Sequence, residues 1–164
     1  MDERQLVQIM IDSLLQRLLE EFGESLVSVV LYGSVARGNF RLDSDIDLLL
    51  VFEELPPRRF ARYNLIHPIL QEVERSNSQD WEGGQHHRFS TILKTREEAR
   101  DTSRYYIDMT TDAVLLYDRD GFFGSVLDQL RARMKQLGSR KVYIGDRWYW
   151  DWKPDYRFGE FIEL

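Results

Sequence analysis

The sequence predicts an α/β fold, or α+β by stricter definitions, with a mixed β-sheet flanked by α-helices. Its 164 residues suffice for one well-buried core and are too few for two. Helical and strand-like hydrophobic patterns alternate along the chain, and the composition, 43% hydrophobic and 30% charged, is typical of a globular protein. We therefore expect a single domain over residues 1–164, with a core at about 3–137 and an aromatic tail at 141–164.

The first half of the chain predicts a helix, two strands and a second helix. Apolar residues recur at spacings of three and four over 3–22, and Gly23 follows as a stop signal. The β-branched run SLVSVVLYG predicts a strand at about 26–32, and SDIDLLLVFEE predicts another at about 45–53. The sequence LPP then breaks the chain, and helical spacing resumes at about 58–75.

The second half predicts two further strands, each followed by a helix. HRFSTILK has the pattern of a third strand, and Thr95 stands three residues before Glu98, the spacing of a capping box that opens a short helix. DAVLLYDRDG predicts a fourth strand that ends in an Asp-Gly turn. FFGSVLDQLRARMKQLG predicts a last helix with Gly138 as its stop. Strands joined through helices imply a mixed sheet covered by helices.

The tail carries three of the four tryptophans, Trp148, Trp150 and Trp152, at alternate positions. Alternation favours a strand that lays one aromatic face on the core. Two other interpretations stay open. The aromatic residues are typical of a partner-binding face, or they form a stacking platform for single-stranded nucleic acid, which the aspartates among the rings disfavour.

Composition and charge exclude several classes of protein. The chain has no cysteine, which excludes disulfides and thiolate chemistry and favours a reducing cytoplasm. The acidic, amphipathic N-terminus is unlike a signal peptide, and no apolar run is long enough to span a membrane. A net charge of −6 argues against extended tracking along nucleic acid. Five arginines nevertheless cluster within residues 37–62: Arg37, Arg41, Arg58, Arg59 and Arg62. Such a cluster would hold a triphosphate. For the last three, solvated charges on a helix face are an equally good interpretation.

Two like charges, Asp45 and Asp47, open the second predicted strand. Because side chains alternate along a strand, both carboxylates point the same way, with Cα atoms about 6.5–7 Å apart. Their repulsion costs on the order of a few kcal/mol when desolvated unless a cation lies between them. Mg²⁺, with Mn²⁺ as an alternative, fits because it binds through one or two carboxylates plus substrate phosphates. The alternative is a solvent-exposed strand end with two hydrated aspartates.

A Gly-Ser pair ends the first predicted strand. Gly33 allows close backbone approach to a phosphate, and Ser34 offers a hydroxyl and the N–H groups of a starting helix. The loop is not a Walker A motif. Gly33 and Gly38 have the required separation, but Asn39 and Phe40 stand where Lys and Ser/Thr are needed.

The stretch GSVARGNFRLDSDIDLLLVF resembles the signature of the DNA polymerase β-type nucleotidyltransferase superfamily. In length and layout the chain is similar to its minimal nucleotidyltransferases, some of which are antitoxins paired with HEPN-type RNase toxins. The resemblance implies that Gly33 and Ser34 bind the triphosphate and that Asp45 and Asp47 hold the metal. Two further motif positions have a structural or substrate-proximal role, Arg37 and Ser44.

The resemblance implies a Mg²⁺-dependent nucleotidyltransferase. Such an enzyme moves a nucleoside monophosphate from an NTP, with ATP as the first candidate, to a hydroxyl of a protein, an RNA or a small molecule and releases pyrophosphate. The alternative is a catalytically weak nucleotide-binding or antitoxin-like module paired with a HEPN-type protein.

The alternative gains weight because active members of the superfamily carry a third carboxylate on a later strand. The equivalent position in HRFSTILK falls at Ser90 or Arg88, and neither is an acid. A serine hydroxyl is a poor metal ligand and no base at neutral pH. Four residues are candidates to substitute for it from the neighbouring loop, although the two histidines are expected to be exposed polar residues: Asp80, Glu82, His86 and His87.

Overall fold

The computed structural model describes residues 2–41, 44–78, 87–145 and 147–162. Its strands are β1 (Leu26–Tyr32), β2 (Ile46–Phe52), β3 (Phe89–Thr95), β4 (Val114–Asp118), β5 (Arg140–Ile144) and β6 (Arg147–Asp151). Its α-helices are α1 (Glu3–Phe22), α2 (Gly33–Ala36), α3 (Arg59–Ser78), α4 (Arg96–Arg100), α5 (Arg104–Asp112) and α6 (Phe122–Leu137). Two short 3-10 helices are η1 (Gly23–Ser25) and η2 (Arg119–Gly121).

A four-stranded mixed sheet forms the centre of the molecule and confirms the predicted α/β class. The strand order is β3-β2-β1-β4, with β1 antiparallel to both of its neighbours and β2 parallel to β3. The two central strands, β1 and β2, are almost wholly buried. This burial on both faces explains why their sequences are continuous apolar runs and do not alternate between polar and apolar residues.

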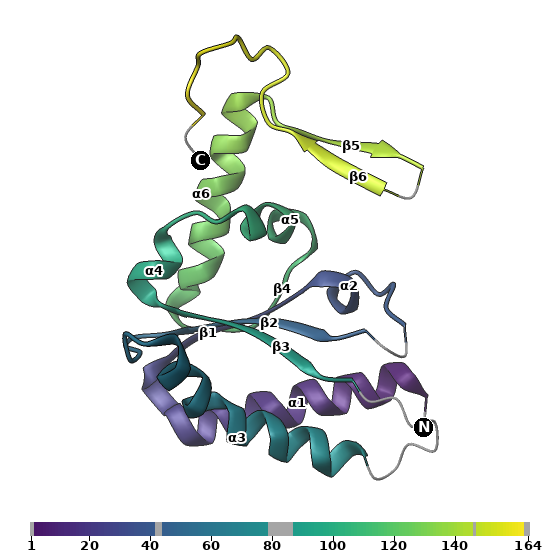
Figure 1. Cartoon of the computed structure of the whole chain (residues 1–164), viewed down its shortest axis with the longest axis vertical. Coiled ribbons are helices and arrows are strands. Elements are labelled where there is room, and N and C mark those ends of the chain that lie inside the picture. Colours follow the sequence, from purple (N-terminus) through teal and green to yellow (C-terminus); the bar gives the residue numbers. More distant parts are fainter. Residues whose placement is uncertain (1, 42–43, 79–86, 146, 163–164) are drawn as a thin grey trace.

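Helices cover both faces of the sheet (Figure 1). Helices α1 and α3 lie on one face, and α4, α5 and α6 lie on the other. Helix α1 contributes Leu14 and Leu18, both at most 1% exposed. Complete burial of one such side chain contributes about 1.5–3 kcal/mol of transfer free energy. None of the helices in the described part of the chain is long and apolar enough to cross a membrane.

Among the described residues, α5 is the one helix longer than a single turn that the sequence patterns did not predict. Its N-cap is Ser103, whose side chain accepts a hydrogen bond from the Tyr105 backbone N–H. Aromatic and β-branched residues give the segment RYYIDMTTD a modest helix propensity. Burial of Tyr106 and Ile107 against the sheet stabilises the helix in place of intrinsic propensity. The strand predicted from residue 112 therefore begins later, at Val114.

The aromatic tail forms a separate antiparallel hairpin, β5–β6, near the C-terminal end of α6 (Figure 1). In its register Tyr143 lies opposite Trp148, and Lys141 lies opposite Trp150, so these four side chains share one face. Trp150 and Trp152 pack against the core beneath α5 and α6. The strand interpretation of the tail is thus correct, but the strand pairs with β5 and not with the main sheet.

Candidate functional site

The Gly-Ser turn and the aspartate pair lie at the same edge of the sheet. Tyr32, the last residue of β1, pairs with Asp47 near the start of β2. The chain then turns at Gly33 into the single turn of α2. Antiparallel pairing therefore brings together two motifs that are about a dozen residues apart in the sequence.

Gly33 contacts the Asp47 carboxylate so closely that no other residue fits. Its φ is +77°, in the left-handed region that favours glycine. A Cβ atom on Gly33 would overlap Oδ2 of Asp47 and stand 3.2 Å from its Cγ. The absence of a side chain at Gly33 thus lets the carboxylate lie against the backbone of the turn.

The environment of Asp47 disfavours its negative charge. Burial raises the pKa of the Asp47 carboxyl above its ordinary value, and the nearby charge of Asp45 adds to the rise. A hydrogen bond with Ser90 and the charge of Arg37 oppose it. Burial and the charge of Asp47 also raise the pKa of Tyr32 to about 12. The ionised form of Asp47 is therefore unfavourable in this environment, and a bound cation would relieve that cost.

Ser90 lies directly beside Asp47 on the neighbouring strand. The parallel register pairs Asp47 with Ser90, and the two side chains are hydrogen-bonded. Arg88 precedes β3, and its carbonyl accepts the Ile46 N–H at 2.8 Å. Of the two positions predicted for a third acid, Ser90 is thus the one that lies within β3 and pairs with Asp47.

Across the described ranges, no three His, Cys, Asp or Glu side chains gather closely enough to hold a metal ion. Asp80, Glu82 and His86, which were candidates to supply a third ligand, lie outside the described residues.

Ser44 and His87 fix the chain just before Asp45. The Ser44 N–H donates to the Arg41 carbonyl and the Ser44 hydroxyl accepts from the Arg41 N–H, both at 2.9 Å. The expectation that His87 is exposed is wrong, because it is only 4% exposed. Its Nδ1 lies 2.7 Å from the Ser44 carbonyl oxygen, and its Nε2 lies 3.4 Å from Oε1 of Glu3 in α1. His87 therefore links α1 to the chain that leads into the aspartate pair.

Replacing His87 with phenylalanine is expected to lower the free energy of unfolding by about 1–3 kcal/mol, because the ring volume is kept while a partly buried hydrogen bond is lost. Urea denaturation measures the change. The matched control is His67→Phe in α3, where the substitution keeps the stacking on Tyr63 and loses only an exposed contact of 3.3 Å between Nε2 and the Tyr63 hydroxyl. Equal losses in the two variants would contradict a specific role for the His87 contacts.

The predicted arginine cluster divides into two groups. Arg62 is held by Glu98, with two hydrogen bonds of 2.7 and 2.8 Å, and by the Pro56 carbonyl at 2.6 Å. These partners lie near the end of β2, about 16 Å along the strand from Asp47 at a rise of about 3.3 Å per residue. Three arginines of α3 and the segment before it therefore lie away from the Gly-Ser turn: Arg58, Arg59 and Arg62.

A pocket of about 370 Å³ opens between the Gly-Ser turn and α5. Gly33 and Arg37 line one side, and Arg104, Tyr105 and Asp108 are among the residues that line the other. The α5 residues of this pocket were not predicted from the sequence, because that helix was not predicted. The signal available was Ser103, a good N-cap ahead of apolar residues at helical spacing.

Arg104 occupies an unfavourable position for a cation. It is the first residue of α5, where the helix dipole disfavours positive charge. Within the described ranges it forms no ion pair, and its guanidinium carbon lies 5.5 Å from the centre of the Tyr105 ring. Tyr105 is 51% exposed. An unpaired cation beside an exposed aromatic ring at a pocket is an arrangement suited to an anionic ligand with a ring system.

The part of the chain that carries these residues matches a known protein family. Residues 11–104 match the family described as "Nucleotidyltransferase domain", and this range holds the Gly-Ser turn, the aspartate pair and Ser90. The chain belongs to the nucleotidyltransferase family.

Similarity to a curated relative extends beyond that range. The nucleotidyltransferase is 30% identical over 156 residues to a Methanocaldococcus jannaschii protein described as a "putative protein adenylyltransferase". The alignment covers 92% of this chain and 96% of the relative. Because so little of the chain is left out, the aligned part includes the β5–β6 hairpin.

Two solved structures are similar to this chain at lower identity. The nucleotidyltransferase is 15% identical to a chain of a toxin–antitoxin crystal structure with AMP-PNP, with a TM-score of 0.46 over 76% of this chain and 90% of that one. It is 21% identical to a "putative nucleotidyltransferase" of Sulfolobus solfataricus, with a TM-score of 0.41 over 73% of this chain and 92% of that one.

Proposed function

We propose that this nucleotidyltransferase transfers a nucleoside monophosphate from an NTP to an acceptor hydroxyl and releases pyrophosphate. The observation that supports it most is the contact between Gly33 and Asp47, whose ionised form is unfavourable because the carboxylate is partly buried. Asp45 lies close by, and a pocket opens beside Gly33. This arrangement puts two carboxylates next to a turn that a phosphate can approach. Transfer of AMP to a protein hydroxyl is the version favoured by the name of the archaeal relative.

Asp45 and Asp47 are the residues that would hold Mg²⁺, or Mn²⁺ in its place. Two carboxylates, one of them disfavoured as a bare charge, match the oxygen ligands that such an ion takes when it arrives with substrate phosphates. When bound, the ion supplies charge neutralisation and polarisation of the phosphoryl oxygens. Ser90 adds a hydroxyl in place of a third carboxylate, so the donor set fits one ion better than two.

The residues around the pair have distinct proposed roles. Gly33 and Ser34 bind the triphosphate through backbone N–H groups and the Ser34 hydroxyl, and Arg37 pairs with a phosphate. Ser44 keeps its place through its bonds with Arg41 and acts by holding the chain before Asp45.

The nucleoside end of the NTP would lie against α5. Tyr105 offers a ring on which a base can stack, and Arg104 offers an unpaired charge near the phosphates. The acceptor oxygen bonds to the α-phosphorus as the bond from that phosphorus to the bridging oxygen breaks. Pyrophosphate leaves with that electron pair, and the hydroxyl proton passes to solvent.

A second candidate function is a catalytically weak nucleotide-binding module of the antitoxin type, paired with a HEPN-type protein. Ser90 favours it, because the position that faces Asp47 carries no group able to take a proton from the acceptor. The two candidates share the nucleotide site and differ in turnover.

Incubation with ATP labelled either at the α- or at the γ-phosphate tests the proposal. Adenylyl transfer to a protein acceptor predicts that α-label becomes covalently attached while γ-label leaves as pyrophosphate. Calorimetric titration with MgATP in parallel measures binding without turnover. Binding with no transfer of either label would support the second candidate, and absence of binding would reject both.

A further inference from the structure

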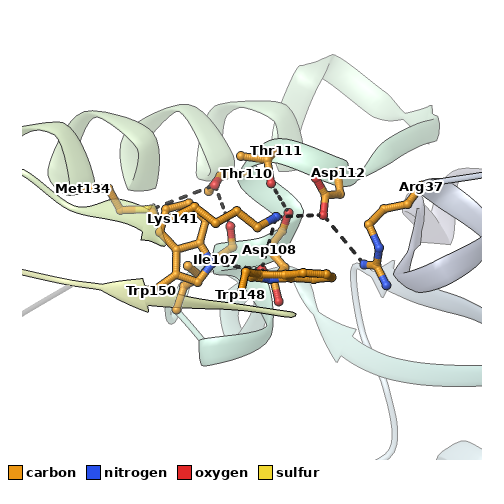
Figure 2. Close-up of polar contacts among 10 residues, drawn as sticks. All are labelled: Arg37, Ile107, Asp108, Thr110, Thr111, Asp112, Met134, Lys141, Trp148 and Trp150. Atoms are coloured by element: carbon orange, nitrogen blue, oxygen red, sulfur yellow. Dashed lines mark hydrogen bonds and ion pairs between the residues drawn. The ribbon is translucent and has the colours of Figure 1, made fainter. Parts of the chain in front are cut away.

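We propose that the β5–β6 hairpin is part of the nucleotide site and that Trp148 acts as a positioning residue for Arg37. The proposal rests on the proposed function in assigning a phosphate to Arg37. It extends the site to a segment outside residues 11–104, the range that matches the family. Figure 2 shows the side chains concerned, which come from Arg37 at the end of α2, from α5 and from the hairpin.

Arg37 lies between the hairpin and the pocket. Its guanidinium carbon stands 5.1 Å from the centre of the Trp148 ring, a distance typical of a cation–π contact. Its Nη1 lies 3.7 Å from Oδ2 of Asp112, too long for a hydrogen bond. Arg37 also lines the pocket beside Gly33, and its charge opposes the rise in the pKa of Asp47. The guanidinium is therefore oriented by a ring while its N–H donors remain available to an anion.

Trp148 is itself held in a fixed position. Its indole N–H donates to Oδ1 of Asp108 at 3.1 Å, and the Trp150 N–H donates to the same oxygen at 2.9 Å (Figure 2). Asp108 belongs to α5 and lines the pocket. Two indoles on one carboxylate oxygen fix the hairpin to α5, so the ring beneath Arg37 cannot move without breaking a charge-assisted hydrogen bond.

Lys141 competes with Arg37 for the carboxylate of Asp112. Its Nζ lies 3.3 Å from Oδ2 of Asp112, closer than Arg37 does, and 4.5 Å from the centre of the Trp148 ring. Asp112 is thus shared between two cations and pairs mainly with the lysine. The hairpin contributes a ring that orients Arg37 and a cation that keeps the competing carboxylate engaged.

The test is a double-mutant cycle on MgATP affinity, measured by calorimetry on the full chain. Trp148→Leu is expected to weaken binding about 5–10-fold, because a cation–π contact of about 1 kcal/mol and its orienting effect are lost. In an Arg37→Ala background the same substitution is expected to change affinity less than twofold, because Trp148 acts through Arg37. A purely structural role would weaken binding by the same factor in both backgrounds, and that result would overturn the proposal.

Two further variants keep the test decisive. Tyr149→Leu is the matched control, since Tyr149 is 52% exposed on the opposite face of the hairpin and should leave affinity unchanged. If Trp148→Leu does not fold, Lys141→Met replaces it, and about threefold weaker binding that disappears in the Arg37→Ala background is expected. Unchanged affinity in Lys141→Met would then overturn the proposal.

The double variant with asparagine at positions 45 and 47 distinguishes failure of the proposed function from failure of the proposed role of the hairpin. If it binds MgATP as the unmodified protein does, the proposed function fails. If it loses binding while Trp148→Leu binds normally, only the role of the hairpin fails.

Discussion

Replacing Asp45 and Asp47 together with asparagine is expected to lower the rate of nucleotidyl transfer about 10³-fold or more. The two carboxylates are the proposed metal ligands, and metal-assisted stabilisation of phosphoryl transfer is worth several kcal/mol, with each 1.36 kcal/mol equal to a factor of ten in rate. The measurement is transfer of α-labelled ATP at saturating Mg²⁺. A rate within tenfold of the unmodified protein would contradict the assignment of this pair.

The same variant is expected to be more stable at neutral pH, not less. The pKa of Asp47 is raised in the folded protein, so its ionised form is less favourable there than in the unfolded chain. Above the raised pKa this difference opposes folding, and neutral asparagine removes it. Urea denaturation at pH 7 measures the effect, with Asp12→Asn on the surface of α1 as the control. Loss of transfer with a gain in stability would exclude misfolding as the cause of inactivity.

Replacing Gly33 with alanine is expected to abolish nucleotide binding and transfer. The added Cβ would overlap Oδ2 of Asp47, and the residue would also be held at φ +77°. The carboxylate must therefore move away from the turn, which separates the proposed metal ligand from the proposed phosphate site. A left-handed conformation costs an alanine roughly 1–2 kcal/mol in addition.

Gly38→Ala separates the two effects of this substitution. Gly38 has a similar φ of +72°, but nothing lies within 4 Å of the position that its Cβ would take. Both variants should lose comparable backbone stability, and only Gly33→Ala should lose MgATP binding by calorimetry. If the control loses binding equally, strain in the turn and not the contact with Asp47 is the cause.

Much of the fold could be predicted because its signals are local and long. The helix expected at 3–22 and the strand expected at 26–32 have those bounds in the structure, since apolar periodicity over several turns leaves one favourable face. The capping box at Thr95 also forms as expected. The proximity of Gly33 to Asp47 follows from a short connection between two buried strands.

The missed features depend on contacts between distant segments. Helix α5 has a weak intrinsic preference and is stabilised by its packing on the sheet. Nothing near Asp108 in the sequence indicates that two indole N–H groups, 40 and 42 residues later, share its carboxylate. His87 likewise lies against Glu3, which is far away in the sequence. Such pairings are set by tertiary packing and leave no local pattern.

The parallel register of β2 and β3 places residue 90 where a third carboxylate would join Asp45 and Asp47. Adjacent strands lie about 4.8 Å apart, and the ladder fixes residue 90 opposite residue 47 whatever side chain residue 90 carries. A carboxylate introduced there would be delivered by the backbone to the neighbourhood of the existing pair. A single substitution at residue 90, with no rearrangement of the sheet, would therefore give this chain three neighbouring acids instead of two.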